Sequence, residues 1–234
     1  MPPVNITHRF PCNMEAADRI DFEGEENYST NNVLISSYKH VYVSPDSVVY
    51  RNGLVLKESL ASAGYKNYYQ YRHLIKKMFF TKKTVLRDEK KYLLVTDYWS
   101  EGHFHWFCDV LPKLLCIKHI TREFVLLLPD TPYIRTIALE SLQWLNLDFE
   151  DIVWMNDKRF YSVKNLVYVS RVSNSGQMHP ELMKKLQERF NAGKTRTKRI
   201  YISRDQARFR KVINEPTLIG LLKEYGFEVV NNEE

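Results

Sequence analysis

Short apolar runs alternate with helix-forming segments along the chain from residue 92 onward. Pro132 falls in the first turn of one such segment, where its missing N–H costs nothing, and Gly226 lies just past the end of another. This alternation indicates an α/β fold with a doubly wound parallel sheet. Strands are predicted over 92–95, 124–128, 152–154, 166–169, 199–203 and 227–230, and helices over 102–120, 132–145, 180–190 and 214–225.

The chain before residue 92 has a different pattern. Residues 1–30 are polar and acidic, which predicts a loosely structured lead-in. Between residues 33 and 56, short runs rich in β-branched residues are separated by turn signals, of which Asn52-Gly53 is a strong hairpin signal. We therefore expect a small antiparallel β unit ahead of the parallel sheet.

A polar segment at residues 191–198 separates a finished helix from a new strand and marks a predicted domain boundary. The strand, helix and strand that follow are too few to bury a core of their own. We therefore expect an N-terminal α/β domain over residues 1–195, including the β-rich lead-in, and the start of a second domain over residues 196–234 that the chain leaves incomplete.

Composition narrows the class of protein. Hydrophobic residues make up 44% of the chain, which indicates a globular protein. The net charge of +6, from 34 basic and 28 acidic residues, is too small an excess to indicate a nucleic-acid binder. Three cysteines without a CxxC pair, no signal peptide and no apolar run near the ~20 residues of a membrane span predict a cytoplasmic protein.

One segment, residues 65–91, mixes basic and aromatic side chains. It contains nine Lys and Arg residues interleaved with Tyr and Phe. One interpretation is a solvated helix whose aromatic side chains face the core. The other is a basic aromatic surface that contacts anionic lipid, which would place the protein at the inner face of the membrane, or that grips a phosphorylated acceptor.

The densest cluster of chemically active side chains is residues 102–112, which follow a predicted strand and open a helix. Ligands bind at this edge of open α/β sheets. His105 and Asp109 are four residues apart and share one face of a helix, so the carboxylate can orient the imidazole for proton abstraction from a hydroxyl. The alternative is a purely structural role, either as a cluster of polar side chains that caps the helix or as a His105 side chain buried against Trp106.

A second cluster, residues 194–211, is strongly basic and has Asp205 as its only acid. Arg204 ends a predicted strand, and Arg208 and Arg210 follow in the turn before a helix. Guanidinium groups in such a loop suit bidentate contacts with phosphates, although a solvated charged loop would have the same composition.

Several motifs are absent from the sequence. It contains no GxGxxG, no GxxxxGKS/T and no GxSxG. It also has no Asp-x-Asp and no set of His, Cys and carboxylate residues with metal-site spacing. These absences argue against a dinucleotide cofactor, a P-loop and a bound metal.

The two clusters resemble glycosyltransferase family 61. Residues 103–114, His-Phe-His-Trp-Phe-Cys-Asp-Val-Leu-Pro-Lys-Leu, are similar to the family's His-Trp-x-x-Asp-x-Leu-Pro-Arg/Lys-Leu block. Residues 199–215, followed by Gly226-Phe227, are similar to its Tyr-Ile-Ser-Arg…Ala-x-x-Arg…Asn-Glu…Gly-Phe block, and residues 41–56 give a weaker match. The resemblance extends from about residue 40 to the end of the chain.

The resemblance implies a GT-B-like architecture, in which two Rossmann-like domains face each other across a cleft. It implies inverting, metal-independent transfer from a nucleotide sugar to a glycan or lipid-linked acceptor, as in bacterial capsule or exopolysaccharide assembly, with no cofactor. His105 would be the general base and Asp109 its orienting partner, or the reverse, and His103 is a further candidate for the base. The diphosphate would be bound by Arg204, Arg208 and Arg210.

The family's sequence continues into a His-Gly-Ala-Gly-Leu block of the nucleotide-binding domain, and this chain stops before such a block. The expectation is therefore a member truncated at its C-terminus. The alternative is a non-catalytic fragment that binds a glycan or a partner protein. Nucleic acid is not an expected partner.

Overall fold

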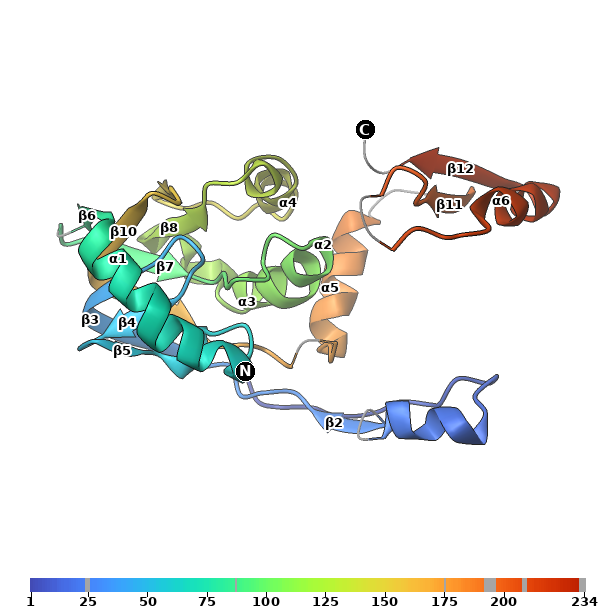
Figure 1. The fold of residues 1–234 in the computed structure, drawn as a ribbon, viewed down its shortest axis with the longest axis horizontal. Helices are drawn as coiled ribbons and strands as arrows, with labels where there is room; N and C mark the ends of the chain where they lie inside the picture. Colours follow the sequence, from blue (N-terminus) through green and yellow to red (C-terminus); the bar gives the residue numbers. More distant parts are fainter. Residues whose placement is uncertain (24–25, 87, 175, 192–196, 208–209, 232–234) are drawn as a thin grey trace. The chain divides into compact units, whose positions relative to one another are not determined.

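The computed structural model describes the chain except residues 24–25, 87, 175, 192–196, 208–209 and 232–234 (Figure 1). The chain divides into two compact units, Met1–Phe190 and Asn191–Glu234.

The first unit is built on one large mixed sheet with the strand order β5-β4-β3-β10-β7-β8-β9, while β6 pairs with β10 off this path. Four adjacent strands of this order, β10, β7, β8 and β9, run parallel to one another. The remaining pairs on the path, β10 with β3, β3 with β4 and β4 with β5, are antiparallel. The bounds are β3 Ile35–Val43, β4 Val49–Arg51, β5 Leu54–Val55, β6 Lys82–Leu86, β7 Lys91–Leu94, β8 Phe124–Pro129, β9 Asp151–Met155 and β10 Arg159–Val169.

The α/β class predicted from the strand–helix alternation is confirmed, but the sheet is mixed rather than wholly parallel. The expected small antiparallel unit is part of the same sheet, because β3 pairs with β10 along eight registered positions from Ile35↔Val169 to Val43↔Tyr161. The predicted hairpin at Asn52-Gly53 joins β4 and β5, and both residues have positive φ (53° and 74°), as a type I′ turn requires.

The expected loose lead-in is instead partly ordered. The strands β1 Asn5–Thr7 and β2 Asn27–Ser29 form an antiparallel pair, and a 3₁₀-helix covers Ala16–Phe22 between them. Reciprocal contacts between Glu15 and Asp18 close the first turn of that helix, so two of the acidic residues act as local caps.

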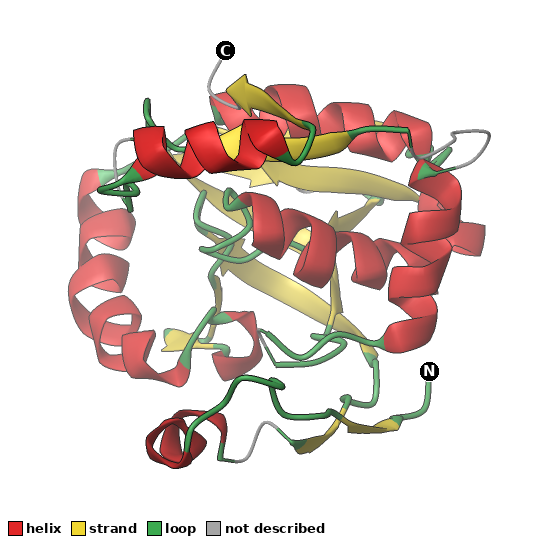
Figure 2. Cartoon of the chain, turned by 90° about the vertical axis from the view of Figure 1, so that its right-hand side faces the viewer, coloured by secondary structure: helices red, strands yellow, loops and turns green. Residues whose placement is uncertain are grey.

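Helices lie on both sides of the sheet (Figure 2), and three of them cover its larger core. The apolar side chains of β8 are buried on both faces, and Leu126 and Leu128 pack in a core with Trp106, Leu114 and other residues of the covering helices. These helices are α3 Leu111–Cys116, α4 Leu139–Trp144 and α5 Pro180–Phe190. The opposite face holds a second core in which Val125 and Leu127 pack with residues of β3 and β10.

The helix predicted over 102–120 is broken into several turns. It consists of α2 His103–His105, a π-helical turn Trp106–Val110, α3, and a 3₁₀-helix Lys118–Glu123. Pro112 explains the wide turn, because its ring clashes with the carbonyl of Cys108 four residues earlier and it has no N–H to donate. Other short helices are Lys57–Ser59, Ala63–Tyr65, the π-helical turns Tyr68–His73 and Ile134–Ala138, and α1 Leu74–Phe80.

The second unit is a single βαβ motif among its described residues. The parallel strands β11 Arg199–Ser203 and β12 Phe227–Asn231 flank α6 Glu215–Glu224, as predicted. Gly226 has φ 76°, so it ends the helix in the conformation that favours glycine.

Candidate functional site

The candidate site lies where the parallel strands end. Along the chain, β7 leads to β8 and then β9 on one side of the sheet, whereas β10 lies on the other side of β7. The loops after β7 and β10 leave the carboxyl ends of two neighbouring parallel strands, the edge at which ligands usually bind in an open α/β sheet. Residues 95–102 follow β7, and residues 170–174 follow β10.

His105 and Asp109 form the pair that the sequence predicts. His105 Nδ1 lies 2.8 Å from Asp109 Oδ2, and the side chains are 26% and 8% exposed respectively. The pair bridges α2 and the π-helical turn, so the widened backbone sets its geometry. A buried carboxylate on Nδ1 fixes the tautomer in which Nε2 accepts a proton, which is the arrangement of a general base.

A loop residue, Trp99, stacks against His105. Their ring centroids are 5.1 Å apart with an interplanar angle of 33°. A Cβ on Gly102 would lie 3.1 Å from His105 Cδ2 and 3.2 Å from Trp99 O, so only glycine fits comfortably there. The alternative in which His105 is buried against Trp106 is not what the structure shows. Trp106 is a fully buried core residue, and its Nε1–H donates to Ser141 Oγ at 2.7 Å.

His103, the reserve candidate, is exposed and lies apart from the pair. Its Nδ1 lies 3.2 Å from Tyr133 Oη, and its ring is 4.6 Å from that of Phe107. His103 therefore contacts the segment before α4, whereas His105 contacts Asp109.

A buried charge network behind the loop was not predicted from the sequence. Arg171 donates to Asp97 Oδ2 at 2.5 Å, and its guanidinium carbon lies 5.6 Å from the Trp99 ring. Lys113 is fully buried and donates to Val95 O at 2.8 Å. These contacts fix the loop that holds Trp99 on His105.

The network also shifts pKa values. Burial alone would raise the pKa of Asp97, but the positive charges of Lys113 and Arg171 outweigh it and hold that pKa below its ordinary value. Burial lowers the pKa of Lys113 to about 8, against the opposing attraction of Asp97. Lys113 lies in the Leu-Pro-Lys-Leu part of residues 103–114, and the resemblance of that segment to the family block is the one sequence signal that could have indicated it.

Two cavities border the loop after β7. The first, of about 510 Å³, is lined by Trp99, Ser170 and Arg171 together with residues of 31–34 and 57–63, and Asn174. The second, of about 260 Å³, is lined by polar residues that follow β7, β8 and β9 and by residues from the β3–β4 loop and the 68–80 helix: Asp46, His73, Lys77, Asp97, Tyr98, Glu101, Asp130, Thr131 and Asp157. His105 lines neither cavity directly, but its stacking partner Trp99 lines the first.

The second cavity contains a His–carboxylate contact of its own. His73 Nε2 lies 3.3 Å from Asp46 Oδ2, and His73 Nδ1 lies 2.7 Å from Tyr50 Oη. Burial by itself would raise the pKa of Asp46, but the hydrogen bond and charge of His73 lower it to about 2. Hydrogen bonds from Ser44 and Tyr69 also lower the pKa of Asp46, so protein groups hold this carboxylate on several sides of the cavity.

The basic cluster lies in the second unit. The backbone N–H of Arg204 donates to Glu215 Oε1 at 2.6 Å, and its Nε–H donates to Arg210 O at 3.1 Å. The backbone hydrogen bond from Arg204 lowers the pKa of the buried Glu215, which therefore remains an acceptor for the loop. Arg210 is exposed and has φ 57°, while Arg208 lies outside the described residues.

Among the described residues, no group of three or more His, Cys, Asp or Glu residues has a geometry that could hold a metal ion. Within the same residues, no helix is long and apolar enough to cross a membrane.

The fold and site define an α/β protein with a carboxylate-oriented histidine close to the carboxyl ends of its parallel strands. Residues 103–234 match the family described as Glycosyltransferase 61, and the chain belongs to this family. The match begins at His103 and includes all the site residues predicted from the sequence. Comparisons with curated proteins and with solved structures find no match.

Proposed function

We propose that this protein is an inverting, metal-independent glycosyltransferase that moves a sugar from a nucleotide sugar to a glycan or lipid-linked acceptor. The observation that carries the proposal is the His105–Asp109 contact of 2.8 Å within the segment that matches the family. An imidazole held by a buried carboxylate is suited to accept the proton of an acceptor hydroxyl.

In the proposed reaction, His105 Nε2 takes the proton as the acceptor oxygen attacks the anomeric carbon. The bond from that carbon to the diphosphate oxygen breaks, and the nucleoside diphosphate leaves with the electron pair. Arg204, Arg208 and Arg210 would stabilise its charge through hydrogen bonds to the phosphate oxygens. The acceptor sugar would bind in the second cavity, whose polar lining includes Glu101, Asp130 and Asp157.

The architecture and setting are part of the same proposal. Residues 1–195 would form the acceptor-side domain of a GT-B-like protein, and residues 196–234 the start of its nucleotide-sugar domain. The βαβ motif of β11, α6 and β12 supports this, because Rossmann-like domains are built from such units. The setting would be cytoplasmic, at the inner face of the membrane, in surface polysaccharide assembly, without a cofactor or obligatory metal.

The test is a transfer assay with the purified chain. It is incubated with UDP-, GDP- and CMP-linked sugars and a panel of glycan acceptors, with and without EDTA, and release of free nucleotide is measured. We expect acceptor-dependent release for one donor, unchanged by EDTA. Release abolished by EDTA would contradict the metal-independent mechanism, and no release by the folded chain would favour the non-catalytic, glycan-binding or partner-binding alternative.

A further inference from the structure

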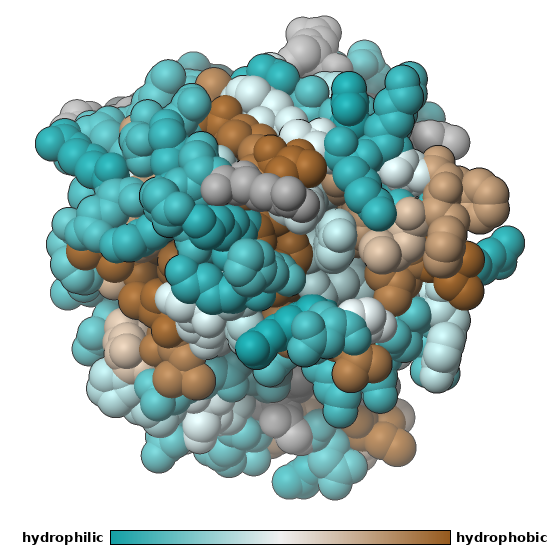
Figure 3. Space-filling view, turned by 90° about the vertical axis from the view of Figure 1, so that its left-hand side faces the viewer, coloured by the Kyte–Doolittle hydropathy of each residue, from teal (hydrophilic) through white to brown (hydrophobic). Residues whose placement is uncertain are grey.

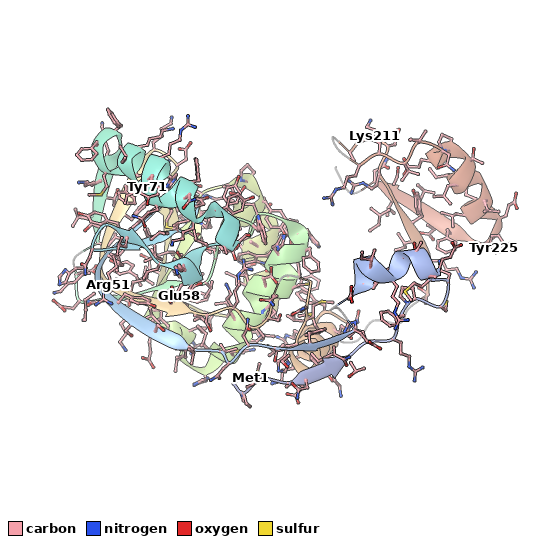
Figure 4. The ribbon with its side chains drawn as sticks, turned by 60° about the horizontal axis from the view of Figure 1, so that its bottom comes forward. Met1, Arg51, Glu58, Tyr71, Lys211 and Tyr225 are labelled. Atoms are coloured by element: carbon pink, nitrogen blue, oxygen red, sulfur yellow. The ribbon has the colours of Figure 1, made fainter. Side chains whose placement is uncertain are left out.

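The helical segment from Tyr68 to Phe80 leaves an apolar stripe exposed to solvent. Its exposed large side chains recur at helical spacing: Tyr71 is 64% exposed, Ile75 53%, Phe79 78% and Phe80 82%. Figure 4 labels Tyr71 on this helix. Of the two interpretations of this segment, the one in which its aromatic side chains face the core holds for Tyr69, which is buried, but not for Tyr71, Phe79 and Phe80.

The opposite face of the same helix explains why the stripe points outward. Tyr69, His73 and Lys77 recur every four residues and face the protein: His73 contacts Asp46 and Tyr50, and Lys77 donates to Asp157 O at 2.9 Å. Leu74 and Met78 also face the protein and pack against a core that contains Tyr69, so this side already supplies the apolar contacts that hold the helix in place. The outward stripe is therefore apolar surface additional to that core contact.

The surface around the stripe is positively charged. The sequence has no Asp or Glu between Glu58 and Asp88. Arg72 and Lys76 are exposed on the helix, and Lys82 and Lys83 are exposed at the start of β6, directly after Phe80. None of these four cations forms an ion pair with a described residue. Figure 3 looks onto the side of the unit that carries β6 and shows apolar side chains among hydrophilic ones.

We propose that this face, defined by Tyr71, Ile75, Phe79 and Phe80 with Arg72, Lys76, Lys82 and Lys83, docks on an anionic lipid bilayer. Cations without acidic neighbours complement lipid phosphates, and adjacent phenylalanines at the end of a helix enter the boundary between headgroups and acyl chains. Exposed phenylalanines would otherwise leave apolar surface in water. The inference stands on the surface of the first unit and does not depend on the transfer chemistry.

Docking through this face has a consequence for the acceptor. The helix that would lie on the bilayer also carries His73 and Lys77, which line the second cavity. A lipid-linked acceptor would therefore present its sugar close to the membrane surface on which the helix rests. This favours a lipid-linked acceptor over a soluble glycan and deepens the proposed function.

The test is sedimentation of the full chain with vesicles of phosphatidylcholine, with or without one third phosphatidylglycerol. We expect binding to the anionic vesicles only, weakened by added salt. Each cation near an anionic surface contributes about fivefold in affinity, so the K82Q/K83Q variant should bind roughly 10- to 30-fold more weakly. F79S/F80S should lose at least tenfold.

Matched controls come from cations and an apolar residue elsewhere. The K184Q/K185Q variant removes two cations from α5, and I213S removes a fully exposed apolar side chain of the second unit, so both should bind like the unmodified chain. Equal binding to neutral vesicles, or no effect of either test variant in folded protein, would overturn the proposal. Concentration-dependent self-association that F79S/F80S abolishes, without vesicle binding, would assign the face to a second copy of the chain instead.

Discussion

The contact between His105 and Asp109 makes a specific prediction at the scale of single residues. Replacing His105 with Ala should lower the transfer rate by about 10²–10⁴ with little change in stability, because His105 is partly exposed while its proton transfer would be lost. Asp109→Asn should also slow transfer, since an amide can favour the wrong tautomer of His105. Steady-state rates and thermal melting of each variant check this.

His103→Ala is the matched control, because His103 lies in the same segment but contacts Tyr133 rather than Asp109. We expect less than a tenfold loss for this variant. A larger loss for His103→Ala than for His105→Ala would assign the proton transfer to His103.

The contact between Asp46 and His73 predicts a pH dependence of stability. The pKa of Asp46 is about 2 in the folded protein and 3.8 ordinarily, so the unfolded chain binds more protons in this range. The ionised carboxylate therefore contributes stability above about pH 4 that is lost as the pH falls toward 2, in total about 2 kcal/mol. The His73→Gln variant lacks the imidazole charge that lowers the pKa of Asp46, so burial would raise that pKa instead. Asp46 would then take up its proton at higher pH, and acid unfolding should begin at higher pH.

Thermal melting between pH 7 and pH 2 measures this effect. His119→Gln is the control, because His119 is exposed and should leave the acid profile unchanged. An identical acid profile for His73→Gln and the unmodified chain would contradict the assigned pairing.

Residue patterns predicted the His105–Asp109 contact because four-residue spacing fixes it locally. They did not predict the network of Asp97, Lys113 and Arg171, or the cavity residues Asp46 and His73. These residues are scattered over the sequence and meet only because the loops after β7 and β10 and the β3–β4 loop converge at one edge of the sheet. No local spacing contains that information.

At the scale of the element, Gly102 determines how closely the loop after β7 approaches α2. Its φ of −78° suits alanine, so Gly102→Ala acts by crowding His105 and Trp99 rather than by straining the backbone. A displacement of the imidazole of even a few tenths of an ångström should lower the rate roughly tenfold, because transfer depends on its position. Stability should change by less than about 1 kcal/mol.

Gly220→Ala is the matched control for that change. It lies within α6 with no atom within 4 Å of the added Cβ, so it should leave the rate unchanged and stabilise the helix by up to about 1 kcal/mol. A full rate for Gly102→Ala would mean that the Trp99–His105 stacking does not matter for catalysis.

Elements were predictable where their signals are local. The helix α5 and the strand β11 have the predicted bounds, because an apolar periodicity and a β-branched run specify them directly. The π-helical turn before Pro112 was missed, because the proline's effect falls on the carbonyl of Cys108, four residues earlier. The sequence left two interpretations of the 68–80 segment, because periodicity does not tell which face of a helix meets the core.

At the scale of the whole molecule, pairing over long sequence distances limits prediction. The antiparallel strands 35–55 looked like a separate unit, but β3 pairs with β10, more than a hundred residues later. Such a pairing depends on the complete sheet rather than on either strand. The boundary between the two compact units falls at the start of the polar segment 191–198.

The two-unit division gives a prediction about where the donor binds. If residues 196–234 start a nucleotide-sugar domain, the Arg204–Arg210 loop should bind the diphosphate even in this chain. Calorimetric titration with UDP, GDP and CMP should then show saturable binding of one nucleotide, unchanged by magnesium. Arg204→Gln should weaken it about tenfold or more, since a hydrogen bond to a charged group contributes about 1.5–3 kcal/mol.

Arg204→Gln leaves the described backbone contact of Arg204 in place, which makes the experiment specific. Glu215 holds the backbone N–H of Arg204, and this bond does not involve the guanidinium. Lys184→Gln, in the first unit, controls for a general loss of positive charge and should bind as the unmodified chain does. If no nucleotide binds, the βαβ unit of residues 199–231 is not sufficient for the donor, and the chemistry of this chain lies on the acceptor side, at His105 and the two cavities beside it.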